Sequence, residues 1–204
     1  MPCANRCLRW ALVLLSAMLV TSCATHKYVL NKEYPQLSVD KEYDGILEEQ
    51  MCKCSVDGPT ERRMLIYLPK TYYESNESYP VFYLLHGARG NELSWIEKGN
   101  ILHNIDSLRA AGLMREMIVV LPNVNQYDDD IDFNKSRIKG AVESLFETDG
   151  AVETAFVSDV VNAVDSLYRT LPDKEHRAIA GLSIGAMQSM HISANAPDIF
   201  GYIG

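Results

Sequence analysis

The sequence predicts an α/β fold in which a mostly parallel sheet carries helices on both faces. Continuous apolar runs at 81–85 and 117–121 have the composition of strands that are buried on both faces. Between and after these runs, apolar residues recur at helical spacing, as they do over 101–108. Strands that alternate with helices along a chain build a parallel sheet joined by crossover helices. A chain of 204 residues fits one such domain.

The predicted strands begin in a stretch that becomes strand-like from about residue 38. A strand over 64–68 ends at Pro69, which cannot donate to a strand ladder. The strand at 81–85 is followed by a glycine-rich loop, and the strand at 117–121 ends at Pro122. These stops divide the apolar sequence into strands of ordinary length.

The helix over 101–108 is closed by Gly112, because glycine readily adopts the left-handed conformation that ends many helices. The stretch 123–150 is polar and loop-like, and a long loop in a compact domain is often functional. It contains three aspartates at 128–130, which lack the alternating spacing of a calcium loop. We therefore favour a solvated loop over a calcium site.

The last predicted elements surround a short buried strand at 177–180. Before it, Thr154 can cap a helix whose apolar residues recur on one face. After it, a helix runs over 184–195 and is ended by Pro197.

The first 22 residues have the character of a secretory signal peptide. A basic start precedes an apolar run over 10–20, which is too short to span a bilayer. Small residues then lead to Cys23, as in bacterial lipoproteins. We expect a lipid anchor on Cys23, in preference to a plain cleaved signal, a tether at 23–37 and the domain at 38–204. The protein would then be exported and held on a membrane, in the periplasm or at the cell surface.

Net charge and cysteine spacing weigh against two classes of function. The formal net charge of −8 argues against a nucleic-acid partner, because Lys and Arg must neutralise a phosphate backbone. Cys52 and Cys54 have no second Cys or His pair nearby, so they are a weak metal signal. We favour a structural or incidental pair over a strained disulfide.

The chemistry centres on Gly181-Leu182-Ser183-Ile184-Gly185. An apolar strand precedes this Gly-x-Ser-x-Gly motif and a helix follows it, which is the context of a nucleophile elbow. The sharp turn projects the serine hydroxyl above the sheet, and the glycines leave room for the neighbouring strand and helix. We therefore predict Ser183 as the nucleophile and Gly181 and Gly185 as the residues that shape the elbow, in preference to an ordinary glycine turn.

Two backbone amides are predicted to form an oxyanion hole. Ile184 lies at a helix N-terminus, where unpaired N–H groups favour negative charge. The loop at 86–90 (HGARG) can present the second donor, which we assign to the Ala88 amide. His86 precedes the serine, whereas the base of an α/β-hydrolase follows it, so we expect His86 to make structural hydrogen bonds within its loop.

Four blocks of the sequence carry a family resemblance: 79–87 (YPVFYLLHG), Trp95, 156–159 (FVSD) and 176–185 (HRAIAGLSIG). They resemble the "putative esterase" family, which includes feruloyl and acetylxylan esterases (carbohydrate esterase family 1), S-formylglutathione hydrolases and other esterase D-like enzymes, and mycolyltransferases. The resemblance runs from about residue 60 to the last residue and is strongest to bacterial feruloyl esterases. One departure is Ala186, where many members have a second glycine. Trp95 could line the cleft or pack in the core.

The resemblance implies an α/β-hydrolase fold and a triad whose acid and base follow the serine. The one histidine after Ser183, His191, lies along the elbow helix, and Asp198 is as poorly placed to be the acid. We therefore expect a fragment that lacks the triad Asp and His and the C-terminal strands. The strand at 177–180 would then be a bare, aggregation-prone edge.

The implied function is hydrolysis of a carboxylic ester by a serine enzyme that needs no metal or organic cofactor. The resemblance implies feruloyl or acetyl groups on plant cell-wall polysaccharide such as xylan, so the partners would be an acylated saccharide and a membrane. Three alternatives stay open: a catalytically inactive carbohydrate-binding module, an anchored structural protein, and an esterase for another acyl ester such as S-formylglutathione. The intact serine turn favours an enzyme, because a binding module has no need of a strained turn.

Overall fold

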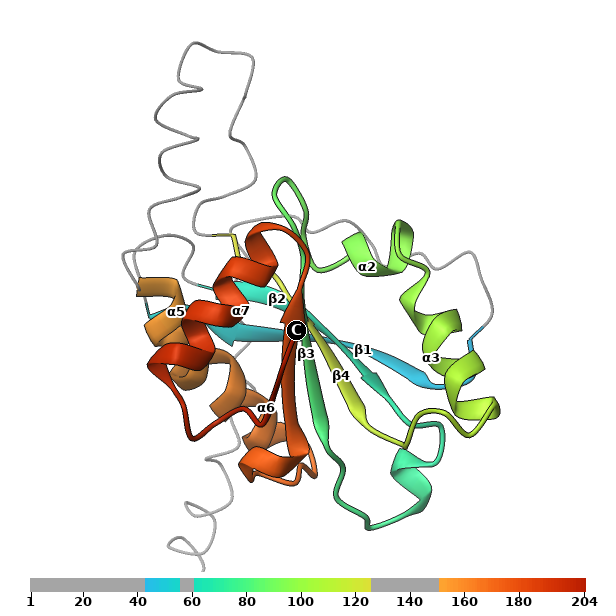
Figure 1. Cartoon of the computed structure of the whole chain (residues 1–204). Coiled ribbons are helices and arrows are strands. Elements are labelled where there is room, and N and C mark those ends of the chain that lie inside the picture. The colour runs from blue at the N-terminus through green and yellow to red at the C-terminus, as the bar shows by residue number, and fades with distance from the viewer. Residues whose placement is uncertain (1–42, 56–60, 126–150) are drawn as a thin grey trace, which may run out of the picture. The chain divides into compact units, whose positions relative to one another are not determined.

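A computed structural model describes residues 43–55, 61–125 and 151–204 (Figure 1). They belong to one of two compact units of the chain, Leu37–Gly204. The predicted signal segment, Cys23, the tether and the aspartates at 128–130 lie outside the described residues. Within those described ranges, no helix is both long enough and apolar enough to cross a membrane.

The sheet has six described strands in the order β1-β2-β4-β3-β5-β6. β1, β2 and β4 pair antiparallel, whereas β4, β3, β5 and β6 pair parallel. The expected α/β architecture is confirmed, with an antiparallel extension on one side. The strands are β1 Ile46–Lys53, β2 Glu61–Leu68, β3 Val81–Leu85, β4 Ile118–Pro122, β5 Arg177–Gly181 and β6 Tyr202–Ile203.

Helices cover both faces of the sheet, as the sequence predicts (Figure 1). One face carries α5, a π-helical turn, α6 and α7, and the other carries α2 and α3. Two short 3-10 turns, Tyr72–Glu74 and Lys174–His176, precede β3 and β5. The helices are α2 Ser94–Glu97, α3 Ile101–Ala110, α5 Ala151–Phe156, the π-helical turn Val157–Val161, α6 Asn162–Leu167 and α7 Ile184–Asn195.

Successive side chains of β2 enter two separate apolar layers. Met64, Ile66 and Leu68 lie in the layer beneath α5–α7, and Leu65 and Tyr67 lie in the layer beneath α3. All five are at most 1% exposed. Because strand side chains alternate between faces, a sheet buried on both sides requires apolar residues at every position. This requirement explains the continuous apolar runs in the sequence.

The helix before β5 is longer than the sequence predicts. Phe156, Val160 and Val164 lie buried in the first layer, as their spacing indicates. The prediction that Thr154 caps this helix is wrong, because the helix already begins at Ala151 and Thr154 lies inside it.

The prediction that β5 is a bare edge is also wrong. Tyr202 and Ile203 pair with Ala178 and Ile179, so β6 occupies that side of β5. The Gly204 N–H donates to the Ile179 carbonyl oxygen at 3.0 Å and extends this pairing. A strand of two residues is too short to show a periodic pattern in the sequence.

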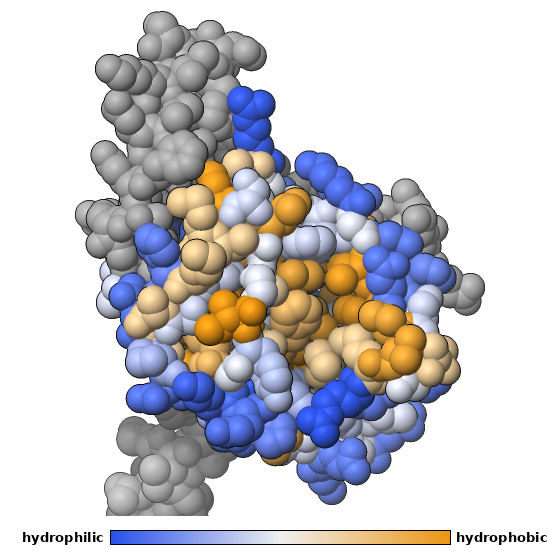
Figure 2. All heavy atoms as spheres, viewed as in Figure 1, coloured by the Kyte–Doolittle hydropathy of each residue, from blue (hydrophilic) through white to orange (hydrophobic). Residues whose placement is uncertain are grey.

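Apolar surface remains open beside this edge. Tyr202 and Ile203 are 64% and 55% exposed. A hollow of about 430 Å³ lies near the amino ends of β3, β4 and β5, lined in part by Val81, Phe82 and Met117. Figure 2 shows apolar side chains gathered across this view of the molecule, between α7 and α3. The carboxyl ends of the parallel strands, where α/β folds bind ligands, lie at the opposite end of the sheet.

Candidate active site

Ser183 lies on the sharp turn between β5 and α7, where it is the N-cap residue of the helix. Its backbone angles are φ 56° and ψ −117°. A positive φ is strained for a residue that has a side chain, and such strain is found at nucleophile elbows. The Leu182 N–H donates to Leu85 O at 3.3 Å and the Ala186 N–H to Ser183 O at 3.0 Å, which holds both sides of the turn.

The two motif glycines make backbone contacts that leave no room for a side chain. A Cβ atom at Gly185 would lie 2.4 Å from His86 O and 2.8 Å from Leu85 O. A Cβ atom at Gly181 would lie 2.3 Å from the carbonyl carbon of Gly185. These distances are far below ordinary van der Waals contact, so glycine alone allows α7 to start directly against the end of β3.

The predicted oxyanion loop lies beside the nucleophile turn. The Gly90 N–H closes a turn by donating to Gly87 O at 3.0 Å. A Cβ atom at Gly87 would lie 3.7 Å from Ser183 Cβ, so this turn adjoins the serine. No recorded hydrogen bond joins the Ala88 or Ile184 N–H to another residue of the described part of the chain. Both amides therefore remain candidate donors, as the sequence predicts.

His86 makes the expected structural hydrogen bond within its loop and a second one to the segment after β4. Its side chain is 3% exposed. The Val124 N–H donates to Nε2 at 3.1 Å, so Nε2 is the acceptor and Nδ1 carries the proton. Nδ1 then donates to Gly87 O at 2.9 Å. The ring thus joins the loop after β3 to the segment after β4.

The described residues bring no histidine into a recorded hydrogen bond with the Ser183 hydroxyl. His103 contacts Ser107, and His176 is paired with an aspartate at its own turn. His191 lies on α7, eight positions after the serine. The described site therefore unites a candidate nucleophile with candidate oxyanion donors.

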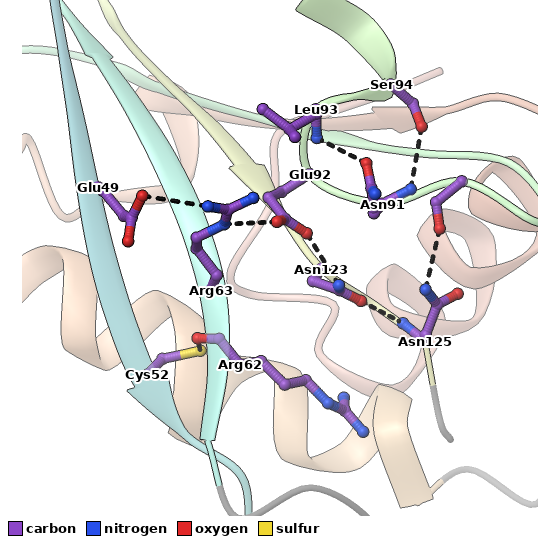
Figure 3. Close-up of polar contacts among 11 residues, drawn as sticks. Glu49, Cys52, Arg62, Arg63, Asn91, Glu92, Leu93, Ser94, Asn123 and Asn125 are labelled. Atoms are coloured by element: carbon purple, nitrogen blue, oxygen red, sulfur yellow. Dashed lines mark hydrogen bonds and ion pairs between the residues drawn. The ribbon is translucent and has the colours of Figure 1, made fainter. Parts of the chain in front are cut away.

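Beside the oxyanion loop lies a buried polar cluster that the sequence does not predict (Figure 3). Arg63 of β2 and Glu92 form an ion pair with Nε–Oε1 at 2.5 Å, and both side chains are 1% exposed. The other Glu92 oxygen accepts from Asn123 Nδ2 at 2.8 Å. The sequence offers only one hint, a charged residue directly before the apolar run at 64–68.

Cys52 and Cys54 are free thiols in the structure, so the disulfide considered from the sequence is not formed. Burial raises the pKa of the Cys52 thiol to about 11, which keeps it protonated at neutral pH. A protonated thiol is a poor nucleophile and a poor metal ligand. Within the described ranges, no cluster of three or more His, Cys, Asp or Glu side chains could hold a metal ion.

Trp95 has a packing role. Its indole Nε1–H donates to Leu85 O at 3.0 Å, and the ring packs in the layer beneath α3. The same Leu85 carbonyl oxygen accepts from the Leu182 N–H of the elbow. Trp95 therefore supports the end of β3 from the face opposite α7.

Parallel strands, helices on both faces and a strained serine turn between strand and helix define an α/β-hydrolase. The chain belongs to the family described as "Putative esterase", whose family model matches residues 55–204.

Relatives of known activity agree with this membership. The chain is 34% identical over 143 residues to an endo-1,4-β-xylanase/feruloyl esterase of Xylanibacter ruminicola. The aligned region covers 68% of this chain and 18% of that protein. A CE1 ferulic acid esterase of the anaerobic fungus Anaeromyces mucronatus is 29% identical, with a TM-score of 0.63, over 85% of this chain and 62% of that chain. That enzyme is also solved in complex with ferulic acid. The chain thus spans less than two thirds of either relative.

A Gly185→Ala substitution should lower the free energy of unfolding by about 1–3 kcal/mol, because the new methyl group would collide with backbone carbonyl oxygens of β3 and its loop. Glycine to alanine within a helix otherwise stabilises by about 0.5–1 kcal/mol. Urea unfolding, monitored by circular dichroism, measures whether the free energy of unfolding falls or rises. The control is Ala194→Gly at an exposed position of α7. Its effect on the free energy of unfolding should reflect helix propensity alone. A more stable Gly185→Ala protein would contradict the contact.

Proposed function

We propose that this protein is a serine esterase that removes feruloyl or acetyl groups from plant cell-wall polysaccharide such as xylan. The observation that carries the proposal is the strained backbone of Ser183 between β5 and α7. Strain at one residue costs about 1–3 kcal/mol and persists where the surroundings impose it, chiefly at functional sites. Membership of the esterase family supports the same chemistry.

In the proposed reaction, Ser183 Oγ attacks the acyl carbonyl carbon while a general base removes its proton. The carbonyl oxygen becomes an oxyanion that accepts hydrogen bonds from the Ala88 and Ile184 N–H groups. Collapse of the tetrahedral intermediate expels the saccharide alcohol, which takes up the proton, and leaves an acyl-serine. Water then attacks the acyl group, releases the carboxylic acid and restores Ser183. No step uses a metal ion or an organic cofactor.

The choice of substrate is supported by the relatives. The bacterial relative is described as both a xylanase and a feruloyl esterase, and the fungal one binds ferulic acid. These descriptions support a feruloyl ester of a xylan-type saccharide, whereas the acetyl alternative rests on the family resemblance alone. A binding module on the same scaffold is less well supported, because binding alone has no use for the strain at Ser183.

The general base and its orienting acid are proposed to lie outside the described residues. The recorded hydrogen bonds of the described histidines lead away from Ser183. Both relatives extend beyond the portion that matches this chain. We also propose export and lipid attachment at Cys23, which rest on the N-terminal sequence alone.

A Ser183→Ala variant should lose ester hydrolysis by about 10⁴-fold or more in kcat, because no hydroxyl remains to form the acyl-enzyme. Release of ferulic acid from feruloylated xylo-oligosaccharide measures this, in the longest form of the protein that its coding sequence allows. The control is Ser166→Ala, which removes an exposed α6 hydroxyl bonded to Ala163 O and should leave kcat unchanged. Full activity of Ser183→Ala would refute the nucleophile.

The 204 residues expressed alone should turn over 4-nitrophenyl acetate only slightly above the uncatalysed rate. Without a base, only the oxyanion donors stabilise the transition state, which leaves a small part of the full rate enhancement. Stopped-flow absorbance at saturating ester gives the rate, and Ser183→Ala gives the background. Robust Ser183-dependent turnover would show that a base is present among these residues.

Lipid attachment predicts that labelled palmitate is incorporated into the protein when it is made in a bacterial cell. A Cys23→Ala variant should lose the label, because that thiol is the proposed acceptor. Cys52→Ala and Cys54→Ala serve as controls and should keep it. Label that persists in the Cys23→Ala protein would rule out this attachment site.

A further inference from the structure

The Arg63–Glu92 ion pair is buried at one end of the sheet and holds the segments around it in place. Neither side chain reaches solvent, so each charge must be balanced by close partners. Arg63 also reaches Glu49 Oε2 at 3.2 Å, and the second Glu92 oxygen holds Asn123 at 2.8 Å. Figure 3 shows these groups converging from β1, β2 and the segments after β3 and β4. Carboxylates on two sides of Arg63 resist displacement of its guanidinium group.

A chain of hydrogen bonds leads from this pair to the oxyanion loop. Asn123 Oδ1 accepts from the Asn125 N–H at 3.1 Å. The Asn125 side chain then donates from Nδ2 to Gly90 O at 2.9 Å. Gly90 closes its turn onto Gly87, and Gly87 lies against the Ser183 turn. Asn125 is therefore the link between the fixed charges and the turn that carries Ala88.

The segment that carries Asn125 is also bonded to the nucleophile helix. Gln188 of α7 is 9% exposed, and its Nε2 donates to Val124 O at 3.3 Å. The Val124 N–H donates to His86, as described above. Residues 123–125 thus contact the oxyanion loop on one side and the elbow helix on the other. Any shift of this segment would change the position of the loop relative to Ser183.

We infer that Asn125 is a positioning residue that sets the place of the oxyanion donor loop relative to the nucleophile. This inference rests on the proposed function, because it matters only if Ser183 and the Ala88 amide act on one acyl group. The described side-chain hydrogen bond of Asn125 goes to Gly90 and not to Ser183 or Ala88. Asn125 acts through the Gly90 carbonyl, which it anchors to the buried pair of Arg63 and Glu92. Displacing a catalytic donor by about 1 Å can reduce its effect by up to about a hundredfold.

The test uses phenylboronic acid as a probe, which needs no turnover. The Ser183 oxygen bonds to the trigonal boron, the hydroxyl proton passes to solvent, and the tetrahedral boronate places an oxygen where the oxyanion would lie. Boron-11 NMR distinguishes the tetrahedral from the trigonal form and gives the affinity. Asn125→Leu removes the amide donor without adding a charge, and we expect it to weaken the adduct about tenfold.

The matched control is Asn104→Leu, because Asn104 Nδ2 donates to the Gly99 carbonyl at 3.1 Å in a loop away from the elbow. It should change the affinity less than twofold, and thermal unfolding of both variants should agree with the parent within a few degrees. If leucine disrupts folding at 125, Asn125→Ala repeats the measurement. In a form that turns over aryl esters, Asn125→Leu should lower kcat about tenfold with KM within twofold.

Three different results would overturn the inference. If Ser183→Ala abolishes the tetrahedral signal while Asn125→Leu binds within twofold of the parent, the proposed function stands and the positioning role fails. If Ser183→Ala keeps the tetrahedral signal, the proposed nucleophile itself fails. An equal loss of affinity in Asn104→Leu would show a general effect of the substitution and would also overturn the positioning role.

Discussion

The nucleophile turn depends on a backbone contact between the end of β3 and the first turn of α7. Gly185 lies against the carbonyl oxygens of Leu85 and His86, and Gly181 lies against Gly185. This contact fixes where α7 begins relative to the sheet, and so it fixes Ser183 in its positive-φ conformation. Strain of this kind persists only where the surroundings impose it. Here the two glycine contacts and the Leu182 hydrogen bond impose it together.

The same strand end also positions the oxyanion loop. The His86 carbonyl oxygen faces Gly185, while the His86 ring bonds to Val124 and to Gly87. The last residues of β3 thus position both the Ser183 turn and the candidate oxyanion loop. Because His86 is buried and polar, it needs partners on both ring nitrogens. The segment after β4 supplies one of them, and that segment is in turn held by the buried charges behind it.

The parts of this arrangement that the sequence predicts are local. The strand at 81–85 and the helix at 184–195 match β3 and α7, because apolar periodicity and turn chemistry act over a few residues. β6 has two residues and no period, so the sequence does not reveal it. The Arg63–Glu92 pair joins residues 29 positions apart, and its existence depends on which strands become neighbours. The candidate site could therefore be predicted where it is built from one segment, and not where topology assembles it.

The distinction between the parts of the site built from one segment and the parts assembled by the strand order affects which catalytic groups can form together. Ser183 and the candidate oxyanion donors lie on loops that two neighbouring parallel strands position directly, so this arrangement does not depend on more distant segments. Under the proposed function, such a half-site would bind a tetrahedral oxyanion, and removal of the serine proton would need a general base. A scaffold kept only for binding would gain stability by relaxing Ser183, because positive φ at a non-glycine residue is unfavourable. The strain at Ser183 therefore favours covalent chemistry over binding alone.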